Sequence, residues 1–235
     1  MNRKENKSKT CNTKDKNEKV SKYFNPRTQI EYVHIQNSIF SILCKKLNSF
    51  YNRLPTIMGD VKDFNNAQGL GVWSYHIQRD RTKLLRNPAN FGPLSSSKNN
   101  KKFIDSNTEL IENCIRHFIR IVSVEFPNFH LKKEYEFVID TNPFRLSTSY
   151  FHRDGGEDFL LFIYPKTNPV GTYISGPNTE GDQDTVHQSM KKLPSVKQCD
   201  AIMIHNTNVT HATPVNFRET SNENLSFIRI SMREI

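Results

Sequence analysis

The chain has 235 residues, of which 35% are hydrophobic and 24% are charged, and its formal net charge is +9. A chain of this length can bury a core without disulfide bonds, and no apolar run approaches the ~20 residues that a membrane-spanning helix needs. The first residues lack the hydrophobic segment of a secretory signal, and the four cysteines form no C-x-x-C pair. We therefore expect a cytoplasmic protein with reduced thiols and no membrane partner.

The positive charge is concentrated in residues 1–22, which carry eight Lys or Arg and three acidic residues. This segment is rich in Lys and Asn and shows no hydrophobic periodicity, as is typical of a disordered, solvated tail. Such tails bind acidic partners only in a minority of proteins, so nucleic acid is a weak candidate partner. Residues 23–235 are predicted to form one domain.

Two helices are predicted in the first half of this domain. Between residues 29 and 54, apolar side chains recur at intervals of three and four residues, which is the helical period. Residues 87–102 are rich in polar and helix-breaking residues and are predicted to form a loop. Ser106 and Glu109 fit a capping box ahead of a second apolar stripe, and Pro127 marks the end of that second helix.

From residue 134 onward the pattern changes to short strands separated by turn residues. The segments expected to be strands are YEFVID, FRLSTSYFH, DFLLFIYP, VGTYISG, DAIMIHN, HATPV and LSFIRISMR. Helices followed by strands are typical of an α+β fold with an antiparallel sandwich or barrel. The domain therefore divides into a helical part, residues 23–133, and a β part, residues 134–235.

The segment YFHRDGGEDF, residues 150–159, contains an H-R-D triplet before two glycines. A protein kinase would carry Asn five positions after the Asp, where this chain has Phe159, so a kinase is not supported. Because side chains alternate along a strand, His152 and Asp154 should point to one face and Arg153 to the other. His152 and Asp154 can then bind one metal ion, but H-x-D alone is a weak signal and needs a third ligand.

His205 and His211 are the candidates for that third ligand. Both lie in DAIMIHNTNVTHATPV, which begins as an apolar strand and ends in polar residues. We favour His211, because it borders the apolar strand with no evident partner in the sequence, and we expect His205 at a strand end near the site. Two His and one carboxylate leave open positions for substrate and O2, and this ligand set is typical of non-haem iron oxygenases.

The segment LSFIRISMR is apolar on both faces, so this strand should be buried on both sides. A buried guanidinium needs an anionic partner. Arg229 can hold a carboxylate by two hydrogen bonds, and the hydroxyl of Ser231 can add a third. An internal salt bridge, or an arginine that reaches solvent, is the alternative. Arg218 competes as an anion anchor but lies among polar residues. Together with the upstream histidines, a bound dicarboxylate explains Arg229 best.

The pattern of H-x-D, a distal His and Arg-x-Ser resembles that of the Fe(II)/2-oxoglutarate-dependent dioxygenases. The resemblance covers roughly residues 135–235 and implies a double-stranded β-helix, the jelly-roll or cupin-like fold, with N-terminal helices packed on one sheet. It implies three Fe(II) ligands and a 2-oxoglutarate site, which are carried in this sequence by His152, Asp154 and His211 and by Arg229 and Ser231. Tyr150 shares a face with the first two ligands and is either a cofactor or substrate contact or a buried aromatic residue.

This family oxidises 2-oxoglutarate with O2 to succinate and CO2 and couples that step to hydroxylation of a primary substrate. The resemblance therefore implies a dioxygenase of the hydroxylase type, because Asp154 completes a triad that halogenases lack. No catalytic residue beyond the metal site is implied. The pattern assigns no subfamily, and the substrate is a small molecule or a protein side chain. Residues 176–198 are long enough for a lid, but an irregular surface loop fits them equally well.

Two other functions are compatible with the same residues. A cupin-like metalloprotein of another reaction class, a hydrolase or isomerase, would bind zinc or manganese at the three metal ligands and would need neither Arg229 nor O2. A non-catalytic interaction module would keep the fold and use the basic tail to bind an acidic partner. The intact metal triad argues against that module.

Overall fold

The computed structural model of the chain describes residues 17–27, 29–51, 72–77, 84–91, 98–130, 135–142, 153, 156, 158–164, 173–175, 191–192, 196–206, 209–212 and 227–234. In chain order, the elements are β1 (Lys19–Asn25), β2 (Ile30–Gln36), α1 (Ile39–Tyr51), β3 (Val72–Ile77), β4 (Leu84–Phe91), α3 (Lys98–Glu125), β5 (Tyr135–Asn142), β6 (Phe159–Ile163), β7 (Tyr173–Ser175), β8 (Lys191–Lys192), β9 (Ala201–His205), β10 (Thr210–Ala212) and β11 (Phe227–Glu234).

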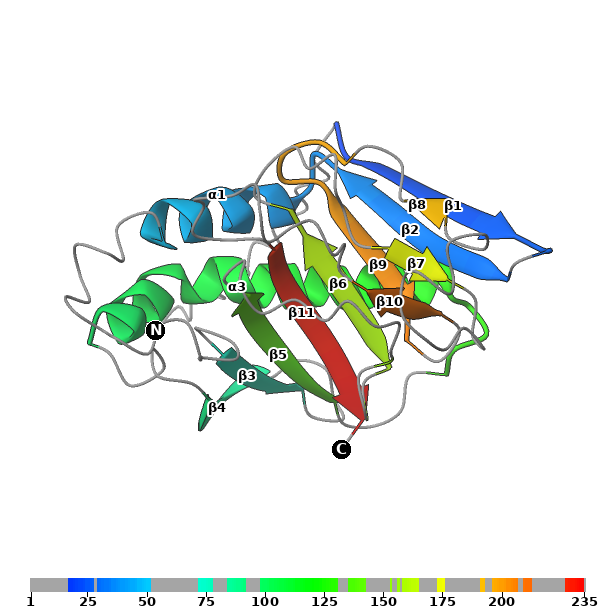
Figure 1. Cartoon of the computed structure of the whole chain (residues 1–235). Helices are drawn as coiled ribbons and strands as arrows, with labels where there is room; N and C mark the ends of the chain where they lie inside the picture. Colours follow the sequence, from blue (N-terminus) through cyan, green and yellow to red (C-terminus); the bar gives the residue numbers. More distant parts are fainter. Residues whose placement is uncertain are drawn as a thin grey trace, which may run out of the picture.

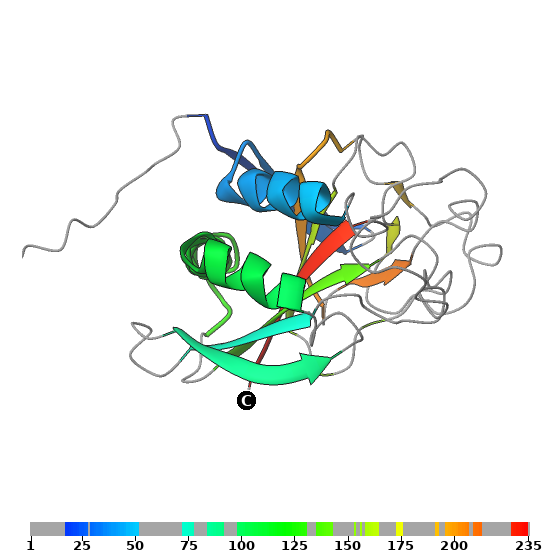
Figure 2. The same ribbon diagram turned by 90° about the vertical axis from the view of Figure 1, so that its left-hand side faces the viewer.

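In this part of the chain, most strands form one large antiparallel sheet in the order β1-β2-β9-β6-β11-β5-β3-β4. A small antiparallel sheet has the order β10-β7-β8. Helices α1 and α3 lie on one side of the large sheet and the small sheet lies on the other (Figures 1 and 2). These layers explain why β6 is buried along its whole length.

After β6 the chain alternates between the two sheets. It enters the small sheet as β7 and β8, returns as β9, leaves again as β10 and comes back as β11, between β5 and β6. The predicted α+β class with helices packed on one sheet is confirmed in this form. Predicted strands coincide with β5, β6, β7, β9 and β11, and HATPV begins one residue earlier as β10. The strand predicted at residues 144–152 lies outside the described residues.

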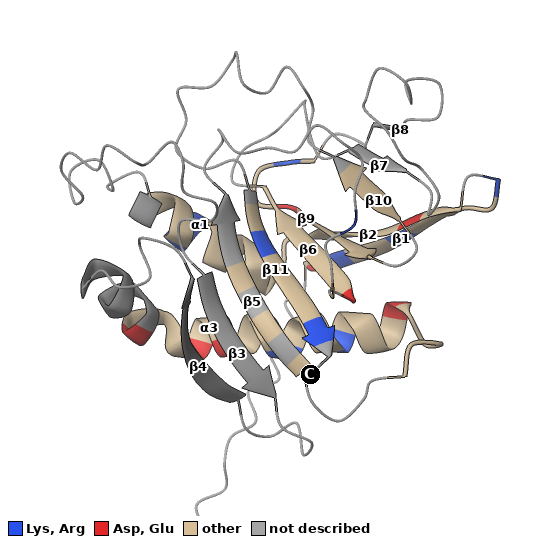
Figure 3. Cartoon of the chain, turned by 60° about the horizontal axis from the view of Figure 1, so that its bottom comes forward, with Lys and Arg blue, Asp and Glu red and all other residues tan. Residues whose placement is uncertain are grey.

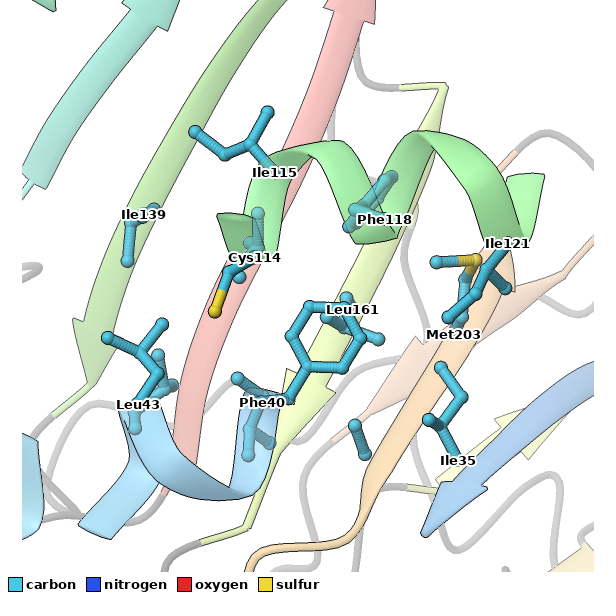
Figure 4. Close-up of a cluster of buried hydrophobic side chains, with 14 of the residues drawn as sticks. Ile35, Phe40, Leu43, Cys114, Ile115, Phe118, Ile121, Ile139, Leu161 and Met203 are labelled. Carbon is cyan, nitrogen blue, oxygen red and sulfur yellow. The ribbon is translucent and has the colours of Figure 1, made fainter. Parts of the chain in front are cut away.

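The larger core lies between the two helices and the large sheet. Figure 4 shows Phe40 and Leu43 of α1 and Phe118 of α3 gathered with Leu161 of β6. Phe118 also meets Phe137 of β5 edge to face, with 5.7 Å between ring centroids. Such aromatic contacts stabilise a core beyond the area that they bury. The apolar stripe predicted for the second helix is the face that packs here.

A second core lies between the large and small sheets. Because side chains alternate along a strand, β6 contributes to both cores. Phe159, Leu161 and Ile163 belong to the core under the helices, whereas Leu160 and Phe162 belong to the core under the small sheet. We call the face that carries Phe159 the helix-side face of the large sheet, and the face that carries Phe162 its inner face.

Residues 29–54 do not form one helix, contrary to the sequence prediction. The first part is strand β2, and α1 begins only at Ile39. In β2, Tyr32 is buried on the inner face, while Val33 and Ile35 are buried on the helix-side face. A strand buried on both faces has apolar residues at nearly every position, so its spacing also fits a helix.

The boundary of the predicted disordered tail at residue 22 is also wrong, because residues 19–22 belong to β1. Lys22 explains why this segment is ordered. Its Nζ atom lies 2.6 Å from a carboxylate oxygen of Glu31 and donates a hydrogen bond to the carbonyl of Glu125, at the end of α3. It also lies over the ring of Phe126, at 4.5 Å from the centroid. The first 16 residues lie outside the described part of the chain.

The predicted loop at residues 87–102 overlaps two elements, the end of β4 and the start of α3. Strands β3 and β4 form a hairpin that joins the large sheet through β5, so the part called helical also contributes strands. Strand β4 could not be recognised from the sequence, because Pro88 lies within it and proline is typical of loops. Pro88 is tolerated because β4 is the outermost strand, where a missing backbone donor need not break a ladder.

Helix α3 begins at Lys98, so Ser106 and Glu109 lie inside the helix and do not cap it. Between them, Asn107 is buried and accepts a hydrogen bond of 2.9 Å from Lys46 of α1. This contact with α1 stabilises the helical conformation of α3 at Asn107, where the local sequence had predicted the beginning of the helix. Among the described residues, no helix combines the length and apolarity needed to cross a membrane.

Candidate active site

Arg229 lies on β11, in the middle of the large sheet. Its neighbours Ile228 and Ile230 are fully buried on the helix-side face, so the side chain of Arg229 lies on the inner face, together with Ser231. Ser231 is 2% exposed and Arg229 is half-buried, so the inner face of this strand is largely covered, as the sequence predicted. Figure 3 shows two basic segments on β11, which are Arg229 and the exposed Arg233.

Arg229 has a buried aromatic neighbour across the strands. In the register of β11 and β6, Arg229 lies opposite Phe162, and in the register of β6 and β9, Phe162 lies opposite Ile202. Phe162 and Ile202 both belong to the core under the small sheet. Directly opposed residues have Cβ atoms about 4.5–5.5 Å apart, so Phe162 borders the stem of Arg229.

His211 approaches the same Phe162 from the other sheet. It lies in β10 opposite Ile174 of β7, is 5% exposed, and its ring centroid is 5.3 Å from that of Phe162. The Nδ1 atom of His211 and the Nε atom of Arg229 are both shielded from solvent. Phe162 therefore contacts the imidazole of His211 from the small sheet and is the cross-strand neighbour of Arg229 in the large sheet.

The other predicted site residues, Tyr150, His152 and Asp154, lie outside the described residues. Their neighbour Arg153 is exposed. The turn predicted before β6 is present at Gly156, whose φ of 80° lies in the left-handed region that favours glycine. No group of three or more His, Cys, Asp or Glu that could hold a metal converges within the described ranges, which include only His211 of the three predicted ligands.

His205, the rival candidate, lies on the wrong side of the large sheet for this site. Its ring stacks on Phe159 with centroids 4.6 Å apart, and it also contacts Phe126 and Phe129. Burial lowers the pKa of His205 below its usual value, although the nearby carboxylates of Asp158 and Glu31 act in the opposite direction. His205 thus lies at the end of β9, the strand end expected from the sequence, but on the helix-side face, whereas His211 contacts Phe162 of the inner face.

A polar pair that the sequence did not single out lies in the same cross-strand row as Arg229. His34 of β2 is opposite Ile202, and its Nε2 atom lies 2.8 Å from an oxygen of the buried Asp200. Gln36 and the backbone N–H of Lys197 donate to the same oxygen, at 3.3 and 3.1 Å. The pair ties β2 to the turn that precedes β9. No sequence signal could have joined residues this far apart in the chain.

No family model matches the chain, and no curated protein matches it in sequence. Solved structures do match. The Fe(II)/(alpha)ketoglutarate-dependent dioxygenase TqaL superposes with a TM-score of 0.54 at 13% identity, over 81% of this chain and 74% of that chain. IDO from Bacillus thuringiensis matches with a TM-score of 0.46 at 14% identity, over 86% and 92% of the two chains.

A Pseudomonas putida prolyl-4-hydroxylase matches with a TM-score of 0.37 at 11% identity, over 87% of this chain and 92% of that chain. The fold comparison depends on TqaL, whose superposition includes most of both chains. The resemblance predicted from the sequence motifs is thus confirmed at the level of the fold, which this chain shares with an Fe(II)/2-oxoglutarate-dependent dioxygenase.

Proposed function

We propose that this protein is an Fe(II)- and 2-oxoglutarate-dependent oxygenase that hydroxylates its primary substrate, built on a double-stranded β-helix. One observation carries the proposal. His211 and Arg229 come from different sheets, and both border the buried Phe162 on the inner face. A metal-binding imidazole and an anion-binding guanidinium on one internal face are what a metal-bound dicarboxylate requires.

The residues present fit these two groups. Iron would be held by His211 together with His152 and Asp154, since imidazole nitrogen and carboxylate oxygen are suitable ligands for Fe(II). The far carboxylate of 2-oxoglutarate would be held by the guanidinium of Arg229, with the hydroxyl of Ser231 as a further donor. Bound together with O2, the metal and 2-oxoglutarate supply the oxidation that yields succinate, CO2 and a hydroxylated substrate.

The protein's own side chains would set up the environment of that reaction. Phe162 is 2% exposed and lies beside the imidazole of His211, so it would limit access of water from that side. In such a dry environment the attraction between the guanidinium and a carboxylate is stronger than in water. The proposed substrate is a small molecule or a protein side chain, and it would be identified by succinate release that depends on its addition.

The decisive experiment is anaerobic addition of Fe(II) and then 2-oxoglutarate to the purified protein, with the visible metal-to-ligand charge-transfer band as the readout. We expect the band with both additions and not with Fe(II) alone. A hydrolase or isomerase on the same ligands would bind metal but give no such band. A folded, metal-loaded protein without the band would contradict the proposal.

Arg229→Met tests the anion anchor. Because a hydrogen bond to a charged group contributes about 1.5–3 kcal/mol, the Kd for 2-oxoglutarate should rise by about 10- to 100-fold, while Fe(II) affinity stays unchanged. Arg233→Met is the matched control, since Arg233 is on the same strand but exposed. Equal Kd values for the two variants would show that Arg229 is not the anchor.

A further inference from the structure

Two buried cysteines from distant parts of the chain lie together beside the helix-side face of the large sheet. Cys44 of α1 is 0% exposed and Cys199, in the turn before β9, is 3% exposed. Both side chains belong to the same buried cluster, and the pKa of each thiol is shifted chiefly by its interaction with the other. The oxygenase proposed above uses neither residue.

The backbone around the two thiols holds them in place. The hydroxyl of Ser41 donates a hydrogen bond of 3.0 Å to the carbonyl of Cys199. Residues three apart on a helix share a face, so Cys44 follows Ser41 on the side of α1 that contacts this turn. The N–H of Cys199 donates to the carbonyl of Tyr164 at 2.7 Å, which fixes the turn to the end of β6. Both partners are therefore anchored independently of their thiol contact.

The backbone conformation at Cys199 does not call for a cysteine. Its φ is 65°, in the left-handed region that glycine adopts without strain and that other residues adopt at a cost. A cysteine at this position is less favourable than glycine for the backbone, but its side chain provides a thiol beside Cys44. This separates the role of the Cys199 side chain from that of its backbone.

The two thiols are chemically unequal. The hydrogen bond with Cys199, reinforced by burial, raises the pKa of the Cys44 thiol. The same hydrogen bond lowers the pKa of the Cys199 thiol. The charge of Lys45 acts in the same direction, whereas burial and the charge of Asp200 act in the opposite direction. Because the thiolate is the nucleophilic form, the more acidic thiol, Cys199, is the sulfur that would attack first in the reaction proposed below.

We propose that Cys44 and Cys199 form a redox pair that a hydroperoxide oxidises to a disulfide joining α1 to the turn before β9. The Cys199 sulfur attacks the peroxide oxygen, the O–O bond breaks, and Cys199 becomes a sulfenic acid with release of water or an alcohol. The Cys44 sulfur then attacks the sulfur of that sulfenic acid, and the displaced hydroxyl group takes the Cys44 proton and leaves as water. The two thiols lose two electrons and two protons, and the peroxide accepts them.

The test treats the folded, reduced protein with hydrogen peroxide and maps disulfides by mass spectrometry of non-reduced peptides. We expect a peptide pair linked through Cys44 and Cys199, reversed by dithiothreitol. The variant Cys114→Ser is the matched control, since Cys114 is equally buried in the same core and should leave the linkage intact. Cys199→Gly removes the thiol while suiting the backbone, so this variant should fold and form no linkage.

Thermal unfolding gives a second readout. The disulfide joins two residues that are 155 positions apart in the sequence (199 − 44), and a long closed loop restricts the unfolded chain. Oxidised wild type and oxidised Cys114→Ser should therefore unfold at a Tm about 5–15 °C higher than their reduced forms. Cys199→Gly should show no such rise. A wild type that stays reduced while folded, or that pairs either cysteine with another partner, would overturn the proposal.

Discussion

His205 and His211 differ in sequence position by only six residues, but they face opposite sides of the large sheet. Alternation within a strand is strict, so the sequence correctly placed Arg229 and Ser231 on one face and their neighbours on the other. It could not place the two histidines in the same way. The chain turns at Asn206 and changes sheets, and a change of sheet resets the alternation. The side of the large sheet on which each histidine lies is therefore known only from the structure.

The buried position of His205 predicts a pH-dependent stability. Because its pKa is lowered in the folded protein, the unfolded chain binds more protons at low pH. The stability associated with His205 is therefore complete above its unfolded pKa of about 6.5 and is lost as the pH falls below that value. His205→Phe keeps the ring stacking and removes the titration. Its unfolding free energy in urea should depend less on pH between about 4.5 and 7 than that of wild type.

His130→Gln is the control for this experiment, because His130 is exposed and lies outside the aromatic cluster. It should retain the wild-type pH dependence. An unchanged pH dependence in His205→Phe would show that the titration lies elsewhere in the molecule.

At the scale of elements, the β1–β2 hairpin is the largest departure from the sequence prediction. Residues 19–22 of β1 are mostly exposed and polar, and they were assigned to the tail because nothing in their own sequence marks a strand. Its order depends on contacts across the chain, among them Glu18 with His117 of α3 at 3.1 Å and Lys22 with the end of the same helix. Local periodicity carries no information about such partners. By contrast, β5, β6 and β11 were predictable because the strand pattern lies in their own sequence, as a continuous apolar run in β6 and as largely alternating apolar residues in β5 and β11.

Lys22→Gln tests how the hairpin is held. The change removes an ion pair, a charge at the carboxyl end of a helix and a cation–π contact, which together contribute about 1–2 kcal/mol at a partly exposed site. We expect the urea midpoint to fall with an unchanged m-value. Lys19→Gln, on the same strand and exposed, should be near neutral. Equal midpoints for the two variants would show that Lys22 does not stabilise the hairpin.

At the scale of the whole molecule, the sequence predicted strands but not their neighbours. The order β9-β6-β11-β5 joins segments separated by tens of residues, and strand pairing over such distances leaves no local trace. His211 and Arg229 were assigned to one site from the motif pattern and not from hydrophobic periodicity. The structure adds a neighbour that both residues share, the buried side chain of Phe162.

Because the proposed ligands would connect the two sheets, their binding should stabilise the folded protein as a whole. A ligand at about 100 times its Kd adds ~2.7 kcal/mol, which corresponds to a Tm rise of about 5–10 °C for a chain of this size. Under anaerobic conditions, Fe(II) and then 2-oxoglutarate should raise the Tm in two increments. Arg229→Met should keep the first increment and lose the second. If 2-oxoglutarate does not raise the Tm of the wild-type protein, the result would argue against the proposed site.

The position of β11 has a consequence for how this protein is made. β11 is hydrogen-bonded to β5 on one side and to β6 on the other, so those two strands are not neighbours. Until the ribosome has released residues 227–234, the large sheet is divided into two halves with open edges at its centre. The nascent chain can complete neither its central hydrogen-bond ladder nor the row that holds Arg229. Open edges of this kind invite pairing with other chains, so the period before β11 inserts is when a chaperone would be most useful.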